Sequence, residues 1–411
     1  MEFFEKTVVS ALDEGVSSIS DLIDAADGAF ILEIYNVLKK IVTESCDSDN
    51  NKDISIAKKI LKEFTNKFNT VEYKKQTERI NYLPIPHILD SDWRFTSQTT
   101  KYLGEYVKKL LKPQSNLILI GVPSLFLLLN ENKTLIDSAT LLIERNNIAR
   151  NFTGNPNIIC GDVRNVRLYN CSDAILCDPP WYIEATKYFL DSAQAMLKKD
   201  GVLLMIVPPK GVRPSVEEEY KQLIEYAAER KLNFSKILNN SLNYVTPPFE
   251  INTLKNEGIT SFPLDWRKGS IMIFTKEQDT ALSSELPTEN KQTEWLDSEI
   301  QNIRFKVRDY VDPDQKKPID HLCKNDIYPT VSMRLELKNN VNIWTSGNRV
   351  YRCKTPVLFR MTLAMVHTHG FSRSKIYSVL NETEETKAYL DLIEKIVKIE
   401  EKEYGRFWSK K

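Results

Sequence analysis

The sequence predicts an α/β protein with a Rossmann-like, doubly wound and mostly parallel sheet. A helical, winged-helix-like domain is expected before this sheet, and a mixed α/β region is expected after it. Two observations lead to this fold: apolar runs alternate with helical segments between residues 116 and 275, and apolar residues recur at helical spacing in the first 42 residues. With 411 residues, the chain is too long for one ordinary core. We expect domains at residues 1–78, 79–277 and 278–411.

The composition is that of a globular protein without a charge bias. Lysine and arginine together number 56, as do aspartate and glutamate, which argues against a strongly basic nucleic-acid-binding protein. The first ten residues lack the basic and apolar regions of a signal peptide, and no apolar run approaches the ~20 residues of a membrane helix. The six cysteines form no Cys-x-x-Cys pair, and there are four histidines. We therefore expect no metal, no membrane and a reduced, cytoplasmic location.

The N-terminal part is predicted to be a small helical bundle. Apolar residues share one helical face in three stretches: residues 2–13, 29–42 and 54–68. Ser18 and Asp21 resemble a capping box before a further short helix, and Asp27-Gly28 makes a tight turn. This order resembles a winged-helix or helix-turn-helix module, with the polar residues 46–53 as a linker or wing tip. Its third helix is only weakly basic, so docking to a protein or homodimerisation is favoured over DNA contact.

The central part is expected to alternate strands and helices. A helix is predicted over Ser97–Leu111, after the Pro-rich and aromatic segment Leu83–Thr96, which is unsuited to a helix. Strands are predicted at residues 117–120, 139–143, 157–160, 174–177 and 201–207, and those at 234–238 and 271–274 close the sheet. Helices are predicted over residues 182–197 and 217–230. The alternation indicates right-handed crossovers between parallel strands.

The C-terminal region is less regular. The polar residues 276–294 are predicted to be a linker, and a loop is predicted over Asn342–Val350. Trp344 and Arg349 in this loop are expected to reach the substrate or to serve a partner surface. Helices follow over residues 357–366 and 384–404, the second with Glu and Lys at the spacing of a solvated face.

Three predicted strands end in residues suited to holding a ligand. The first ends at Gly121, and Pro123 and Ser124 then begin a helix, where a ligand can approach the backbone. Glu144 ends the second strand, where a carboxylate accepts hydrogen bonds from ribose hydroxyls. Asp162 follows the third strand, where it would receive an adenine amino group. Each acidic residue alone is more often a cap or turn residue, but their succession favours one shared site.

The segment Asp178-Pro179-Pro180-Trp181 follows the fourth strand and leads into Tyr182. Because proline continues neither a sheet ladder nor a helix, the chain is expected to leave the strand in an extended turn. This turn offers a carboxylate, backbone carbonyls and flat aromatic faces, which together suit an amino group. The alternative is a turn whose aromatic residues are packed in the core.

Residues 84–275 resemble class I S-adenosylmethionine-dependent methyltransferases that methylate amino nitrogens. That family carries (D/N)PP(Y/F/W) after its fourth strand, in adenine-N6 and some protein-lysine methyltransferases, and CDPPW at residues 177–181 matches it. The turn LIGVPSL and Glu144 are similar to the lysine-methylating branch. The domain order also resembles N4-bis(aminopropyl)spermidine synthase, but Gly121-Val122-Pro123-Ser124 stands here in place of that enzyme's Gly-Asp-Asp-Asp cluster.

The resemblance implies S-adenosyl-L-methionine as the cofactor, with Asp178 joining the strand-end residues named above in holding it. It also implies metal-free, in-line attack by a neutral amine on the sulfonium methyl group. Asp178 and the Pro179 carbonyl would accept hydrogen bonds from the N–H groups of the amine, within a turn fixed by Pro180. Trp181 would stack on a base or line a channel for an alkyl-ammonium group.

Further substrate contacts are expected from Tyr182, Trp93, Arg94, Phe249 and Trp266. The last four lie in aromatic segments before the first strand and after the fifth, where lids and substrate-selecting loops occur. For each segment, a packed aromatic turn is an equal alternative.

The sequence therefore supports three hypotheses. The first is an N-methyltransferase acting on a nucleic acid, protein or polyamine amine. The second is an aminopropyltransferase acting on a polyamine, and the third is a catalytically silent Rossmann scaffold that binds DNA or protein partners.

Overall fold

The structure is a computed structural model that describes residues 2–44, 52–77, 80, 83–131, 139–145, 155–279 and 295–408. The chain divides into two compact units. The first comprises Met1–Gln76, Trp93–Thr246 and Ile259–Pro287, and the second comprises Thr77–Asp92, Pro247–Gly258 and Thr288–Lys411. Each unit is described by itself below.

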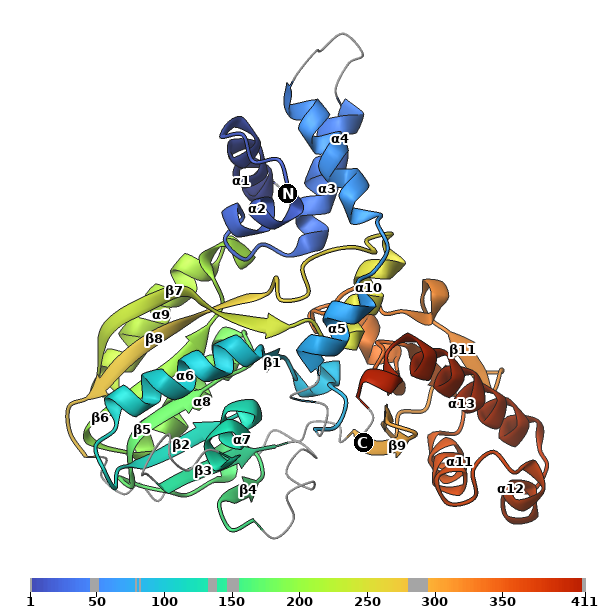
Figure 1. The fold of residues 1–411 in the computed structure, drawn as a ribbon. Coiled ribbons are helices and arrows are strands. Elements are labelled where there is room, and N and C mark those ends of the chain that lie inside the picture. Colours follow the sequence, from blue (N-terminus) through green and yellow to red (C-terminus); the bar gives the residue numbers. More distant parts are fainter. Residues whose placement is uncertain are drawn as a thin grey trace. The chain divides into compact units, whose positions relative to one another are not determined.

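The first unit contains a helical bundle and an eight-stranded sheet (Figure 1). Its elements are α1 (Glu2–Asp13), α2 (Ile19–Ala25), α3 (Ile31–Glu44), α4 (Lys52–Phe64), α5 (Thr70–Thr77), β1 (Arg94–Phe95), α6 (Ser97–Leu110), β2 (Asn116–Ile120), α7 (Pro123–Glu131), β3 (Ala139–Glu144), β4 (Ile158–Cys160), β5 (Ser172–Cys177), α8 (Ile183–Met196), β6 (Leu197–Val207), α9 (Val216–Glu229), β7 (Leu232–Val245) and β8 (Lys268–Lys276).

The strand order of the sheet is β1-β7-β8-β6-β5-β2-β3-β4. The strands β4, β3, β2, β5 and β6 are parallel neighbours, and β8 runs antiparallel between β6 and β7. This arrangement confirms the predicted Rossmann-like, mostly parallel sheet. The strand predicted at residues 234–238 is much longer than expected, because β7 continues as far as Val245.

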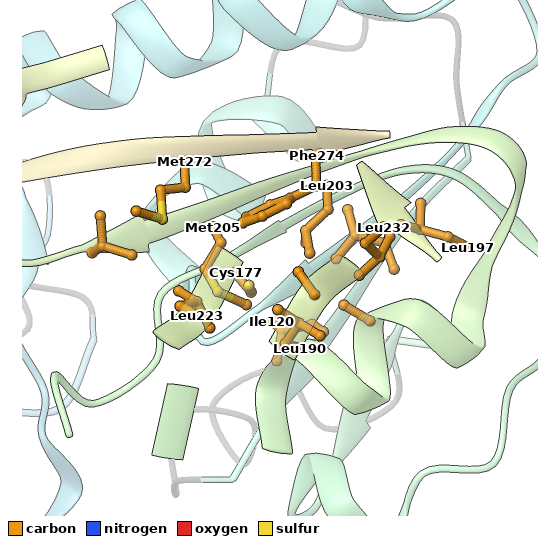
Figure 2. Packing of buried hydrophobic residues seen from close by; sticks show 14 of the residues in the cluster. Ile120, Cys177, Leu190, Leu197, Leu203, Met205, Leu223, Leu232, Met272 and Phe274 are labelled. Carbon is orange, nitrogen blue, oxygen red and sulfur yellow. The ribbon is translucent and has the colours of Figure 1, made fainter. Parts of the chain in front are cut away.

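Alternate residues of the strands face opposite sides of the sheet, as the period of two requires. Leu117 and Leu119 of β2 pack on the side covered by α6 and α7. Ile118 and Ile120 pack on the other side, together with Leu190 of α8 and residues of α9. Figure 2 shows this second cluster, in which residues of β2, β5, β6 and β8 meet the two helices. The two apolar layers fix the strands, and therefore also the positions of the strand ends.

The helical bundle packs around buried residues of α1 to α4, and Ser18 caps α2 as predicted by accepting a hydrogen bond from the Asp21 N–H at 3.2 Å. The tight turn between α2 and α3 contacts the loop after β6, where the Gly211 N–H donates to the Asp27 carbonyl at 3.0 Å. The described residues 2–44 and 52–77 contain no strand, so the winged-helix assignment stays a prediction. Of the expected wing tip, residues 46–51 lie outside the described residues, and Lys52 begins α4.

The second unit contains a five-stranded antiparallel sheet of order β11-β13-β12-β10-β9. Its elements are α10 (Pro248–Asn256), β9 (Leu296–Ile300), β10 (Ile303–Val307), β11 (Ile319–His321), β12 (Ile343–Thr345), β13 (Val350–Cys353), α11 (Pro356–His369), α12 (Arg373–Leu380) and α13 (Glu384–Glu403). This unit confirms the expected mixed α/β region, and α12 is a helix that the sequence pattern did not predict.

The segment expected to be a loop over Asn342–Val350 is a β-hairpin in the second unit. Its turn closes on Glu400 of α13, whose buried carboxylate accepts hydrogen bonds from the Gly347 N–H and the Arg349 guanidinium, each at 3.1 Å. Trp344 is fully buried. Glu400 therefore departs from the solvated face expected for the Glu and Lys residues of the last helix, because it anchors the hairpin, whereas Lys398 and Glu394 form an i,i+4 pair as expected.

Among the described residues, no helix is both long and apolar enough to cross a membrane. The same residues contain no group of three or more His, Cys, Asp and Glu side chains that is arranged to hold a metal ion. Five described cysteines, Cys160, Cys171, Cys177, Cys323 and Cys353, carry free thiols.

Candidate functional site

The candidate site lies where β2 and β5 end side by side. After β2 the chain continues to β3 on one side, and after β5 it continues to β6 on the other. Open α/β sheets bind ligands outside the carboxyl ends of their strands at such a switch in direction. Gly121 follows β2 and Asp178 follows β5. The Asp178 N–H donates to the Ile120 carbonyl at 3.1 Å, which ties the two strand ends together.

Gly121 is required by the backbone at this point. Its φ is +69°, in the left-handed region that side chains disfavour. A Cβ atom on Gly121 would also lie 3.2 Å from the Asp178 carbonyl oxygen. The turn therefore leaves bare backbone beside Asp178, where a ligand can approach closely. Pro123 and Ser124 begin α7 and are both buried, so they support this turn.

The Asp178 carboxyl is enclosed by protein, although the residue keeps part of its surface exposed. The Tyr244 hydroxyl donates to this carboxyl and lies 3.1 Å from each of its oxygens. The pKa of Asp178 is raised to about 8 in total: burial raises it most, the Tyr244 hydrogen bond opposes this by lowering it, and the charge of the nearby Glu144 also raises it. A carboxyl with this pKa changes its charge near neutral pH, which is typical of groups at functional sites.

Glu144 ends β3 with its side chain buried, and it is close enough to Asp178 to influence the titration of that carboxyl. Its carbonyl accepts a hydrogen bond from the Gly161 N–H at 3.0 Å, which joins the ends of β3 and β4. The structure thus brings Gly121, Glu144 and Asp178 to one edge of the sheet. Two carboxylates of different environment lie beside one bare stretch of backbone.

Hydrogen bonds to the carbonyl groups of Pro180 and Trp181 hold the second half of the Asp178–Trp181 turn. The Tyr182 N–H donates to the Pro180 carbonyl at 2.7 Å, and Arg213 donates to the Trp181 carbonyl at 3.0 Å. The Trp181 ring meets the Tyr244 ring edge to face, with 5.8 Å between ring centroids. The aromatic residues beside Asp178 therefore form one packed group, and Trp181 itself remains partly exposed.

Next to this group, a cation is surrounded by aromatic rings. The Arg267 guanidinium carbon lies 4.9 Å from the ring centroids of both Trp93 and Trp266, 5.7 Å from that of Trp181 and 6.0 Å from that of Phe30. We call these four residues the aromatic enclosure. The distances are those of cation–π contacts. Three of the four rings belong to the sheet-containing part of the first unit, and Phe30 comes from the helical bundle.

Other predicted residues have local partners. Asp162 caps the short helix Val163–Asn165 and is paired with Arg164, with 2.6 Å between the charged atoms. Burial raises the pKa of Asp162, but the Arg164 hydrogen bonds and charge lower it more, so the net shift is downward. Arg94 is buried in β1. Phe249 is fully buried in α10, which belongs to the second unit.

Sequence reasoning assigned no role to Tyr244, Arg267 or Phe30. Tyr244 and Arg267 lie in the aromatic segments after the fifth predicted strand, where substrate-selecting loops are expected. The only signal for Tyr244 is its apolar neighbourhood after a predicted strand, and the Asp178 contact joins residues 66 positions apart. Phe30 gives no functional signal, because it looks like an ordinary core residue at the start of a helix.

No protein-family model and no curated protein sequence matches the chain. Among solved structures, it is similar to the branched-chain polyamine synthase of Thermus thermophilus in complex with N4-aminopropylspermidine and 5′-methylthioadenosine. The identity is 8%, the TM-score is 0.49, and the match covers 70% of this chain and 91% of the synthase. A TehB-like S-adenosylmethionine-dependent methyltransferase from Corynebacterium glutamicum matches with 11% identity and a TM-score of 0.28, over 42% of this chain and 86% of its own. Both are similarities in fold at very low sequence identity.

Proposed function

We propose that this protein is an S-adenosyl-L-methionine-dependent methyltransferase that acts on an amino nitrogen. The main support is the position of Asp178-Pro179-Pro180-Trp181 at the switch point of the sheet, directly beside the bare backbone of Gly121. Tyr244, which the motif does not include, holds the carboxyl of Asp178 from a distant strand. The pKa of this carboxyl is raised to about 8, and groups with such perturbed pKa values cluster at functional sites.

The residues present suit the proposed cofactor. Gly121 leaves space where any Cβ would approach Asp178, and Glu144 offers a buried carboxylate at the end of the neighbouring strand. These two residues would hold the cofactor, with Glu144 accepting hydrogen bonds from ribose hydroxyls. When bound, S-adenosyl-L-methionine supplies an electrophilic methyl group on a sulfonium. Asp162 contributes less in this proposal, because Arg164 already occupies its carboxylate.

Asp178 and the Pro179 carbonyl would orient the acceptor. Both are hydrogen-bond acceptors, so they would bind the two N–H groups of an amine and aim its lone pair. As the nitrogen gains positive charge, an ionised Asp178 offsets that charge, and the carboxylate then takes up the leaving proton. Tyr244 keeps the carboxyl oriented, and Trp181 provides a ring face beside the amine.

The first experiment is calorimetric titration with S-adenosyl-L-methionine, S-adenosylhomocysteine and decarboxylated S-adenosylmethionine. Binding of the first two supports the proposal. Preference for the decarboxylated form indicates aminopropyl transfer instead, and no binding of any of the three indicates a silent scaffold.

A matched pair of variants then tests the role of Asp178. Asp178→Ala should abolish methyl transfer to a responsive acceptor while cofactor binding persists. Asp173→Ala, at the opposite end of the same strand, should leave transfer intact. Unchanged turnover in Asp178→Ala would refute the assignment.

A further inference from the structure

The aromatic enclosure is already occupied by a cation. Rings arranged in this way are a favourable site for an alkyl-ammonium group such as that of lysine or a polyamine. Here the Arg267 guanidinium takes that position, within 4.9 Å of two ring centroids and 5.7 Å of the Trp181 ring. A cationic acceptor would have to displace this charge or lie against it. The enclosure beside Trp181 is therefore unsuited to an alkyl-ammonium acceptor.

The polar groups of the enclosure are hydrogen-bond donors. A guanidinium and an indole N–H donate and do not accept. Trp266 has an exposed fraction of 3%, and its indole nitrogen has no hydrogen-bond partner among the described residues. An ammonium group is also a pure donor and offers nothing to these groups. A ligand that carries acceptor atoms, such as phosphate oxygens or the carbonyls and ring nitrogens of a base, complements them.

The main chain of Arg267 is hydrogen-bonded to that of Tyr244, the residue that holds the Asp178 carboxyl. The Tyr244 N–H donates to the Arg267 carbonyl at 3.0 Å, and the Tyr244 hydroxyl contacts Asp178 at 3.1 Å. The Trp181 ring contacts both the Arg267 guanidinium and the Tyr244 ring. An acceptor whose amine is at Asp178 therefore places its neighbouring atoms against Trp181 and Arg267. A planar base fits the ring, and an adjoining phosphate fits the guanidinium.

We propose that Arg267 determines acceptor specificity by excluding alkyl-ammonium acceptors and admitting a nucleobase amine that carries a phosphate, in a nucleotide or a single-stranded nucleic acid. This inference rests on the proposed function, because it assumes that the amine is placed at Asp178. Phe30 completes the enclosure from the helical bundle, so the bundle contributes to acceptor choice through one ring. The overall charge of zero does not oppose this, since recognition needs one local cation and a stacking surface.

The test measures equilibrium binding of five probes to the full chain in the presence of S-adenosylhomocysteine. The probes are adenosine monophosphate, fluorescent single-stranded DNA and RNA oligonucleotides, and the pair of spermidine and a lysine-containing peptide as cationic acceptors. We expect one or more of the nucleotide probes to bind, and neither cationic probe to bind. Preference between the DNA, RNA and mononucleotide arms identifies the source of the base.

Two variants separate the charge of Arg267 from the shape of its side chain, and a third serves as a control. Arg267→Gln should weaken nucleotide binding at least about tenfold and reduce its salt dependence by about one phosphate contact. Arg267→Lys keeps the charge but loses the planar group, so it should retain the salt dependence while losing affinity. Arg230→Gln is the matched control, because Arg230 also lies over an aromatic ring, that of Tyr226, and belongs to a different cluster. The control should bind like the parent protein.

Binding of spermidine or the lysine peptide in place of the nucleotides, or nucleotide binding unchanged in Arg267→Gln, would overturn the inference. Titration with S-adenosylhomocysteine alone keeps the two proposals distinguishable. If the parent protein does not bind S-adenosylhomocysteine, the methyltransferase proposal is refuted. If it binds S-adenosylhomocysteine and also binds the cationic probes, only the proposed role of Arg267 is refuted. Thermal melting of each variant shows whether the first unit remains folded.

Discussion

Replacing Asp178 by Asn removes a carboxyl with a raised pKa, so it should change how the stability of the first unit depends on pH. The pKa of Asp178 is about 8 in the folded protein, whereas the ordinary value is 3.8. Between these values the folded state holds a proton that the unfolded chain has released. The contribution of Asp178 to stability is therefore complete below the unfolded pKa and is lost as pH rises through the folded pKa. The Asn variant has no such dependence.

The size of the effect follows from the interval between the two pKa values. Each pH unit corresponds to about 1.4 kcal/mol, so the whole interval sets an upper bound of about 6 kcal/mol. Asp178 keeps part of its surface exposed, which reduces the penalty of ionisation. We therefore expect Asp178→Asn to gain about 2–3 kcal/mol relative to the parent between about pH 4 and about pH 9, with no further gain above that range.

The measurement is urea unfolding of both proteins at a series of pH values, followed by tryptophan fluorescence. Subtracting the two free energies of unfolding cancels all groups that titrate identically in both. Asp173→Asn is the matched control, because Asp173 is hydrogen-bonded to Lys198 at 2.9 Å and its pKa is lowered despite the opposing effect of burial. Its contribution is lost only as pH falls, so its difference should be flat above about pH 5. A flat difference for Asp178→Asn as well would refute the raised pKa and the reasoning built on it.

Three other substitutions test the site and its supports. Tyr244→Phe removes the hydrogen bond that lowers the pKa of Asp178, so the rising limb of kcat/KM against pH should move upward by about one unit, and a downward shift would contradict the geometry. Gly121→Ala forces a side chain to a φ of +69° and toward Asp178, so calorimetry should show cofactor binding weakened at least about tenfold, and unchanged affinity would argue against Gly121 as a cofactor residue. Gly211→Ala would bring a Cβ into collision with the Ala26 carbonyl, and thermal melting should show a loss of about 1–3 kcal/mol; a neutral result would mean that the bundle does not pack there.

The sheet was predictable because its strands are strongly apolar and its helices separate them. The Asp178 motif follows a run of four buried residues, so both the strand and its end are marked in the sequence. Gly121 and Glu144 were likewise predictable, since each directly ends an apolar run. These positions depend on local patterns, and the parallel topology then brings the ends together without further information.

The rest of the site depends on contacts that local patterns do not encode. β7 continues through polar residues to Tyr244, where pairing with β8 and β1 overrides weak strand propensity. The Arg267 contacts require knowledge of where Phe30 lies, and that is fixed by packing between the bundle and the sheet. Asp162 shows the opposite situation, because an arginine two residues later captures its carboxylate within the same turn. The Asp-x-Arg spacing at residues 162–164 is a local feature of the sequence that is compatible with this pairing.

The contact between the α2–α3 turn and the loop after β6 uses main-chain atoms, since the Gly211 N–H donates to the Asp27 carbonyl. Substitutions of neighbouring side chains can therefore accumulate in either partner without breaking this bond, provided that glycine stays at position 211. A shortened protein without its first 44 residues would lose both this bond and the ring of Phe30. Because the bundle and the sheet belong to one compact unit, such a truncation would also remove packing from the sheet itself, so a change at Arg267 is better tested by replacing Phe30 alone.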